Sequence, residues 1–226
     1  MNEISTTQHD EQLRTRQRLL EVAGEVFAEK GFRNATVREI CEKASANVAA
    51  INYHFGGKEQ LYAAVCQGLF HAALTKYPPT MGAAEGVSAE KRLGVFIKSF
   101  LYRACGEGQP AMQKVVVKEM ADPSGVFPVI VEQMVRPQFL YVRGIVRELM
   151  GDVEVEAGVL DRCVFSVIGQ CLFYRFAQPV IRTLRPEMTY DEATLDVIAE
   201  HVTRFVLAGI EATRDRLLKG KKESGS

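Results

Sequence analysis

The chain has 226 residues, with 28 basic and 28 acidic side chains, so its formal net charge is zero. This balance excludes a uniformly basic nucleic-acid-binding protein and an acidic tail protein, although one face can still be basic. A chain of this length buries enough apolar surface to fold without disulfides or metals. No apolar run reaches the roughly 18 residues of a membrane span. The polar N-terminus lacks the apolar stretch of a signal peptide.

Residues that could carry catalysis or bind metal are scattered along the chain. The five cysteines never form a C-x-x-C pair, and we interpret them as reduced thiols of a cytoplasmic protein. The four histidines lack metal-ligand spacing. The sequence contains no G-x-S-x-G, phosphate-binding glycine loop or H-E-x-x-H motif. We therefore expect no enzyme activity, metal or cofactor.

Apolar residues recur at helical spacing from the start of the chain. The first expected helix runs over 13–30 and ends at Gly31, which suits a left-handed backbone. Thr36 and Glu39 then form a capping box, in which the threonine caps the Glu39 amide and the glutamate bonds back. This box opens a short second helix that ends near Ala44. Residues 1–12 are expected to be disordered.

Asn47 is a good N-cap for a third helix, which should end near Phe55, before Gly56. About three residues join the second helix to the third, the spacing of a helix-turn-helix, whose second helix can enter the DNA major groove. A fourth helix begins at Lys58. The same pattern fits any three-helix bundle with a tight turn, so periodicity alone leaves both interpretations open.

Beyond a Pro/Gly/Ala-rich boundary over 77–88, the pattern remains helical. Further helices are expected over 89–105, 110–121, 126–150 with a kink at Pro137, 155–177 and 191–218. Breaks are expected over 122–125 and 179–186, and the tail 219–226 is expected to be disordered. The fold class is therefore all-α, with an N-terminal helical domain over 13–76, for which a helix-turn-helix is one of the two interpretations, and a larger helical domain over 77–218.

The exposed face of the third helix offers polar and small side chains to DNA. Amides and aromatic groups can contact base edges or phosphates, small residues allow a close approach, and helix N-termini offer amides to phosphate. The candidates are Val37, Asn47, Val48, Ala49, Asn52, Tyr53 and His54.

Three segments carry a family resemblance: Gly31-Phe32, Thr36–Ile40 (TVREI) and Ile51–Leu61 (INYHFGGKEQL). They resemble the DNA-binding domain of the TetR family of regulators over about residues 14–65. The resemblance implies a homodimer with a C-terminal ligand-binding and dimerisation domain. It also implies phosphate contacts from Thr36, Tyr53, His54 and Lys58, and base readout by the exposed part of the recognition helix.

The sequence departs from the family pattern at three positions. Ser45 and Ala49 stand where glycine is frequent, and Asn52 stands where tyrosine is common. Asn52 could read an adenine edge. These departures leave the operator sequence open.

In the second half, Val115–Pro128 and Gly169–Ile181 resemble the C-terminal domain of a TetR subgroup that includes CecR-type regulators.

The helix over 163–177 is apolar all round, which predicts burial on every side, and it is too short and polar to span a bilayer. With the last helix it could form a four-helix dimer interface, whereas a larger monomeric core is the rival interpretation. The interface candidates are Ser166, Gly169, Phe173, Val202, Phe205 and Gly209.

Polar residues within apolar helices are candidates for binding an amphipathic ligand, although each is individually more typical of a structural hydrogen bond or a solvated charge. These candidates are Glu119, Tyr141, Arg143, Gln170, Tyr174 and Arg175.

The sequence thus predicts a cytoplasmic repressor that leaves a palindromic operator when a small molecule binds. The alternative is a helical ligand-binding or scaffold protein without operator-specific binding. The salt dependence of binding to operator and random duplexes distinguishes the two.

Overall fold

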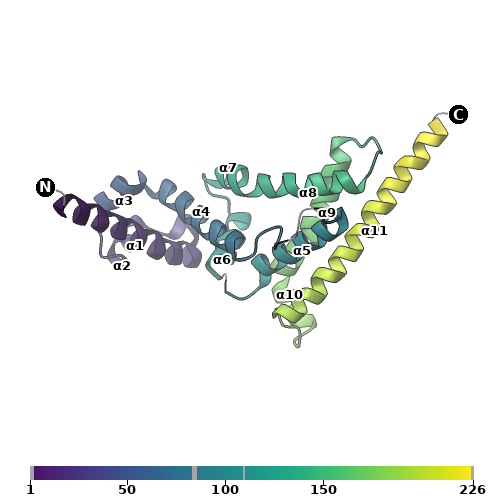
Figure 1. Ribbon diagram of the computed structural model, residues 1–226. Helices are drawn as coiled ribbons and strands as arrows, with labels where there is room; N and C mark the ends of the chain where they lie inside the picture. Colours follow the sequence, from purple (N-terminus) through teal and green to yellow (C-terminus); the bar gives the residue numbers. More distant parts are fainter. Residues whose placement is uncertain (1–2, 83–85, 109, 225–226) are drawn as a thin grey trace. The chain divides into compact units, whose positions relative to one another are not determined.

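The computed structural model describes residues 3–82, 86–108 and 110–224, and every regular element within them is a helix (Figure 1). The expected all-α class is therefore confirmed. Contacts divide the chain into two compact units. The first comprises Met1–Ala72 and Pro110–Met134, and the second comprises Ala73–Gln109 and Val135–Ser226.

The first unit contains the N-terminal helices and one later segment. Its elements are α1 (Glu3–Asn34), α2 (Val37–Lys43), α3 (Val48–Phe55), α4 (Lys58–Lys76) as far as Ala72, α6 (Pro110–Ala121) and α7 (Phe127–Ile130). Its core is built around Phe27, Ile40 and Tyr62. α6 packs against α1, and Val115 and Val126 of the later segment join the same core. The sequence-based boundary at 76/77 separates residues 110–134 from this core, whereas the structure includes them in it.

Local capping chemistry explains where the early helices begin and end. Gly31 interrupts α1 with a φ of 75°. Asn47 accepts a hydrogen bond from the Ala50 amide at 2.8 Å and so caps α3. Gly56 ends α3 in the left-handed conformation, with a φ of 84°. The expected bounds of α2 and α3 and the start of α4 are thereby confirmed.

The second unit is built around α5 (Ala89–Cys105), which packs against α8 (Arg136–Leu149), α9 (Ala157–Phe176) and α11 (Glu192–Ser224). α11 is the long yellow helix in Figure 1. The core of the second unit includes the fully buried Phe96, Ile97 and Val164. The α5 bounds match the sequence expectation.

The structure differs from the sequence expectations in three places. The helix expected over 126–150 is α7, a π-helical turn η1 (Val131–Val135) and α8, so the irregular turn ends two residues before Pro137. The expected break over 179–186 contains α10 (Gln178–Leu184), because Pro179 lies in its first turn, where proline is tolerated. Residues 3–12 and 219–224 are helical, where disorder was expected, while residues 1–2 and 225–226 lie outside the described residues.

Candidate functional site

A Schellman motif closes the turn between α2 and α3. The Ala46 amide donates to the Cys41 carbonyl at 2.9 Å, and the Ser45 amide donates to the Glu42 carbonyl at 3.3 Å. These bonds satisfy carbonyls at the end of α2 and reverse the chain direction. Ser45 has a φ of 49°, in the region that glycine adopts most easily. The serine therefore makes the same kind of turn that a glycine would make.

α3 presents its N-terminal residues to solvent. Val48 is 49% exposed and Tyr53 is 72% exposed. Ala49 and Asn52 are also exposed, while Ile51 is buried against the core. Small apolar and amide groups at the start of an exposed helix can approach base edges in the major groove.

Asn47 has a structural task beside its candidate role in DNA binding. Its Oδ1 is occupied by the Ala50 amide. Only its side-chain NH2 group therefore remains available to a base acceptor.

The candidate phosphate contacts differ in how freely their side chains can move. The Tyr53 and His54 rings meet edge to face, with centroids 5.0 Å apart. Lys58 Nζ donates to the Arg33 carbonyl at 3.4 Å and lies 4.5 Å from the centroid of the Phe32 ring. Partial burial lowers the pKa of Lys58. A phosphate would therefore compete with a carbonyl and a ring face for this ammonium group.

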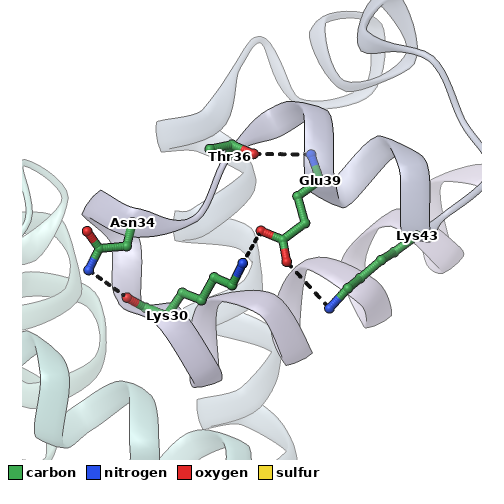
Figure 2. A network of polar contacts seen from close by, with 5 residues as sticks. All are labelled: Lys30, Asn34, Thr36, Glu39 and Lys43. Carbon is green, nitrogen blue, oxygen red and sulfur yellow. Dashed lines mark hydrogen bonds and ion pairs between the residues drawn. The ribbon is translucent and has the colours of Figure 1, made fainter.

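The expected capping box is only half formed. Figure 2 shows that Thr36 Oγ1 accepts from the Glu39 amide, at 3.2 Å. The Glu39 carboxylate turns instead to Lys30 at 2.7 Å and to Lys43 at 3.5 Å. The hydrogen bond from Lys30 is the main cause that lowers the pKa of Glu39. The pair with Lys30 joins α2 to α1, the pair with Lys43 lies within α2, and both neutralise part of the positive charge near the turn.

A group of arginines on α1 was missed by the sequence analysis. The Arg16 guanidinium lies 5.2 Å from the centroid of the Phe55 ring, at the end of α3. Arg14, Arg16 and Arg18 are exposed. No ion pair involving these three arginines is found in the described part of the chain. The L-R-T-R-Q-R run over 13–18 was the available signal.

Two of the ligand candidates already have strong polar partners. Glu119 lies in the first unit, where the Tyr62 hydroxyl donates to Oε1 at 2.7 Å. The Ser124 amide and hydroxyl donate to its Oε2 at 3.2 and 3.1 Å. In the second unit, Arg143 pairs with Asp161 at 2.8 Å. These contacts favour a structural role for Glu119 and Arg143 over a role in ligand binding.

The other four candidates have different surroundings within the second unit. Tyr141 and Tyr174 are partly buried and pack on its core. Gln170 lines a groove between α9 and α11. Arg175 donates from Nη1 to Gln178 at 3.3 Å. Its Nε is buried, with no hydrogen-bond partner among the residues described. The six candidates thus do not form one continuous site.

α9 and α11 leave an apolar face open. Phe173 is 58% exposed and Phe205 is 63% exposed. Ser166, Phe205 and Gly209 line the groove between the two helices, which has a volume of about 300 Å³. A side chain added at Gly169 or Gly209 would meet open space. The face therefore has room for closely packed helices.

One expectation about this face is wrong for a single chain. Val202 is 1% exposed, because it packs into the core of its own unit instead of facing outward. In the segment 163–177, Phe165 and Phe176 are 62% and 40% exposed in one chain, so burial on every side would require a second copy. α9 is long and apolar enough to cross a membrane by length and composition, but the core helix of a soluble protein passes the same test.

The cysteines are all free thiols. Cys163 is half-buried and lines the α9–α11 groove, while the other four are buried. Burial raises the pKa of Cys66 and Cys171 to about 12 and that of Cys105 to about 11. Among residues 3–82, 86–108 and 110–224, no group of three His, Cys, Asp or Glu residues could hold a metal ion.

Comparison with protein families matches both parts of the chain. Residues 19–65 match the family described as bacterial regulatory proteins, tetR family. Residues 89–210 match the C-terminal domain of the HTH-type transcriptional dual regulator CecR.

Individual proteins show the same similarity. The HTH-type transcriptional dual regulator CecR of Shigella flexneri is 27% identical over 90% of this chain and 93% of its own length. The HTH-type transcriptional repressor KstR2 of Rhodococcus jostii is 27% identical over 86% of this chain and 90% of its own. The structure of a putative transcriptional regulator from Pseudomonas aeruginosa PAO1 aligns with a TM-score of 0.65 at 18% identity, covering 89% of this chain and 93% of that one.

Proposed function

Because the chain belongs to the TetR family of transcriptional regulators and has a CecR-type C-terminal domain, we propose that it represses transcription by placing α3 in the major groove of an operator. The family consists of DNA-binding regulators and not of enzymes. The observation that carries the proposal is the capped, exposed start of α3 behind the Schellman turn. A protein of this function acts in the cytoplasm, where the DNA is.

The residues of the turn divide into two groups by the contacts that they can make. Val48, Ala49 and Asn52 face outward and are suited to base edges, together with the free NH2 of Asn47. The second group is suited to phosphates. It comprises Thr36, the Val37 amide, Tyr53, His54, Lys58 and the exposed arginines of α1.

The proposed protein is a homodimer joined through the open face of α9 and α11. The exposed Phe165, Phe173 and Phe205 support this, because large apolar side chains left exposed on two neighbouring helices are typical of an interface. A two-fold dimer presents two recognition helices to half-sites about 34 Å apart, which accounts for a palindromic operator.

A small amphipathic molecule is proposed to release the operator by binding to the second unit. Such a ligand favours one of two conformations by its difference in affinity for them. Buried polar atoms in the second unit, including Arg175 Nε, support a ligand site there.

A gel shift with the DNA that flanks this protein's own gene tests the proposal. We expect a retarded complex with one flanking fragment that persists when a random duplex is added in excess. A random duplex of equal length is the control, and both are titrated with salt. Equal binding to the two duplexes at every salt concentration would contradict operator-specific binding.

A further inference from the structure

The second unit contains a cavity of about 520 Å³, a volume within the range of sites for small molecules. Residues at or next to the end of α4, the end of α5 and the start of α11 line it. Its lining residues differ from those of the α9–α11 groove. Four of them are buried, so the cavity reaches the core of the unit: Tyr102, Gly106, Tyr190 and Leu195.

Acidic side chains outnumber basic ones in the wall of this cavity. The charged lining residues are one lysine, Lys76, and three carboxylates, Glu107, Asp191 and Glu192. Asp191 caps α11, because its carboxylate accepts from the Thr194 amide at 2.8 Å. The carboxylates of Glu107 and Glu192 are exposed and have no hydrogen bond or ion pair within the described part of the protein. These two negative charges are therefore available to a cation.

Tyrosine rings in the same wall already bind ammonium groups of the chain. The rings of Tyr77 and Tyr102 meet edge to face, with centroids 5.2 Å apart. Lys76 Nζ lies 5.2 Å from the Tyr77 centroid, and Lys98 Nζ lies 5.4 Å from the Tyr102 centroid. The face of an aromatic ring attracts a cation through its quadrupole. The cavity thus combines the two kinds of group, carboxylates and aromatic rings, that favour a positively charged ligand.

Tyr190 adds an unsatisfied polar atom to its ring. The residue is 7% exposed, and its hydroxyl has no hydrogen-bond partner among the residues described. The Tyr102 hydroxyl, in contrast, donates to the Asp196 carboxylate at 2.9 Å. A buried polar group without a partner is unfavourable, so an ammonium N–H that donates to the Tyr190 oxygen would remove this penalty.

Lys76 places a competing positive charge at the cavity. Its Nζ lies beside Gly108, where an added Cβ atom would come within 2.9 Å of it. Lys76 is also the last residue of α4, the helix that begins at Lys58 in the first unit. A ligand cation would repel this ammonium group, so its binding would act on the end of a helix that is continuous with the DNA-binding unit.

We propose that this cavity binds an organic ammonium ion with a compact apolar body, and that this cation is the effector. Glu107 and Glu192 attract its charge, and the Tyr190 hydroxyl accepts a hydrogen bond from its ammonium group. Its apolar body packs on Leu195. This assignment rests on the proposed function and deepens it, because it gives the effector a location and a chemical class.

Calorimetry on the full-length protein tests the chemical class. Benzylammonium is the probe, and benzyl alcohol and benzoate are its neutral and anionic counterparts of similar size. We expect benzylammonium to bind about tenfold more tightly than benzyl alcohol, because a hydrogen bond that involves a charged group is stronger than one between neutral groups. Equal binding of benzyl alcohol, preferential binding of benzoate, or no binding of benzylammonium, phenethylammonium and hexylammonium at millimolar concentration would overturn the cation assignment.

Substitutions of opposite charge test the location by the sign of their effects. Lys76→Met removes the competing ammonium group and should tighten benzylammonium binding roughly twofold to fivefold. The double variant Glu107→Gln, Glu192→Gln should weaken it by about threefold to tenfold. The controls Lys91→Met and Glu200→Gln, at exposed positions outside the cavity wall, should leave the affinity unchanged. Weaker or unchanged binding to Lys76→Met, or unchanged binding to the double variant, would overturn the site.

Tyr190→Phe tests the buried part of the cavity. It keeps the ring and removes only the hydroxyl, so the affinity for benzylammonium should fall by about tenfold. The melting temperature without ligand should stay the same or rise, because no hydrogen bond of the protein is lost. Tyr141→Phe, in the same unit but outside the cavity wall, is the control. An unchanged affinity of Tyr190→Phe, or a lower melting temperature, would overturn the placement of the ammonium group against Tyr190.

The operator gel shift separates this inference from the proposed function. Without ligand, failure to bind any flanking fragment would contradict the proposed function alone, because calorimetry measures the cation site without DNA. Saturating benzylammonium should release a bound operator fragment. A complex that persists at saturation would overturn the role of the cavity as the effector site.

Discussion

Ser45 adopts a left-handed backbone conformation, with a φ of 49°, in the turn between α2 and α3. An L-residue pays about 1–2 kcal/mol in a left-handed helical conformation, a cost that glycine avoids. The two backbone bonds of the Schellman motif oppose this cost. The turn geometry is thus compatible with serine at some loss of stability.

Ser45→Gly should therefore stabilise the protein. The gain should be at most about 1 kcal/mol, because glycine also makes the unfolded chain more flexible. Urea denaturation of the two proteins measures the difference. Ser45→Ala keeps the Cβ atom and should leave stability within about 0.5 kcal/mol. A lower stability of the glycine variant would show that the serine side chain supports the turn.

Substitutions of Asn52 and of Lys58 should change DNA binding in different ways. Asn52 is exposed on α3, so Asn52→Ala should change which operator sequence is preferred. Lys58→Met should weaken binding to all duplexes and reduce the salt slope by about 1, since phosphates carry no sequence information. Fluorescence anisotropy with operator and random duplexes over a salt series measures both effects. Unchanged affinity and preference in Asn52→Ala would remove it from base readout.

Local chemistry explains which site residues could be predicted from sequence. Asn47 and Gly56 act on amides and carbonyls within their own helix, so a short stretch of sequence is enough to predict them. The pairing of Glu39 with Lys30 depends on how α1 crosses α2, and the sequence did not predict it. The unsatisfied atoms of Arg175 and Tyr190 depend on tertiary packing in the same way.

The segment from α6 to η1 belongs to one part of the chain by sequence match and to the other by its contacts in the structure. It lies within the residues that match the CecR-type C-terminal domain, yet residues 110–134 form part of the first unit. The bond between Tyr62 on α4 and Glu119 on α6 is a buried polar contact within this arrangement, with residues 1% and 4% exposed. Burial is the main cause that raises the pKa of Tyr62, so its hydroxyl remains a protonated donor.

Tyr62→Phe should destabilise the protein by about 1.5–3 kcal/mol, because a buried carboxylate loses a hydrogen bond. Chemical denaturation gives the value. Tyr53→Phe is the matched control, since the Tyr53 side chain is 72% exposed and its change should lie within about 0.5 kcal/mol. Equal effects of the two substitutions would mean that the bond to Glu119 contributes nothing measurable.

Helix bounds were predictable wherever a cap or a proline marks them. α5 begins after Ser88, whose hydroxyl accepts from the Lys91 amide, and α6 begins at Pro110. α10 was missed because Pro179 was interpreted as a helix breaker, whereas proline in a first turn loses no hydrogen bond. The membership of α6 in the first unit depends on contacts between residues 57 positions apart, such as Tyr62 and Glu119, which periodicity does not reveal.

At the scale of the whole molecule, dimerisation would determine how the protein reads an operator. Two copies joined by α9 and α11 make twice the DNA contacts of one copy and fix the half-site spacing. The exposed phenylalanines of this face would then be covered by the same face of the second copy.

Phe205→Glu should reduce dimerisation by at least about 2 kcal/mol, because a charge would be buried without a partner. Operator affinity should fall with it, while the fold of one chain should persist, since Phe205 is 63% exposed there. Sedimentation at micromolar concentration measures the association. Leu140→Glu, at a 52% exposed position on α8, is the control. A wild-type species of 25.1 kDa that binds a palindromic operator tightly would contradict the dimer.

Because the free thiols differ in exposure, chemical labelling of the natural sequence can follow dimer assembly. Four of the five cysteines are buried, and the raised pKa values of Cys66, Cys105 and Cys171 keep these groups as unreactive thiols at neutral pH. Burial also raises the pKa of Cys163, but this thiol is only half-buried and lines the groove beside Phe205, so its accessibility distinguishes it. A maleimide dye should therefore modify Cys163 first, and in a dimer only as fast as the two copies separate. The labelling rate would then follow dissociation directly, without an engineered cysteine.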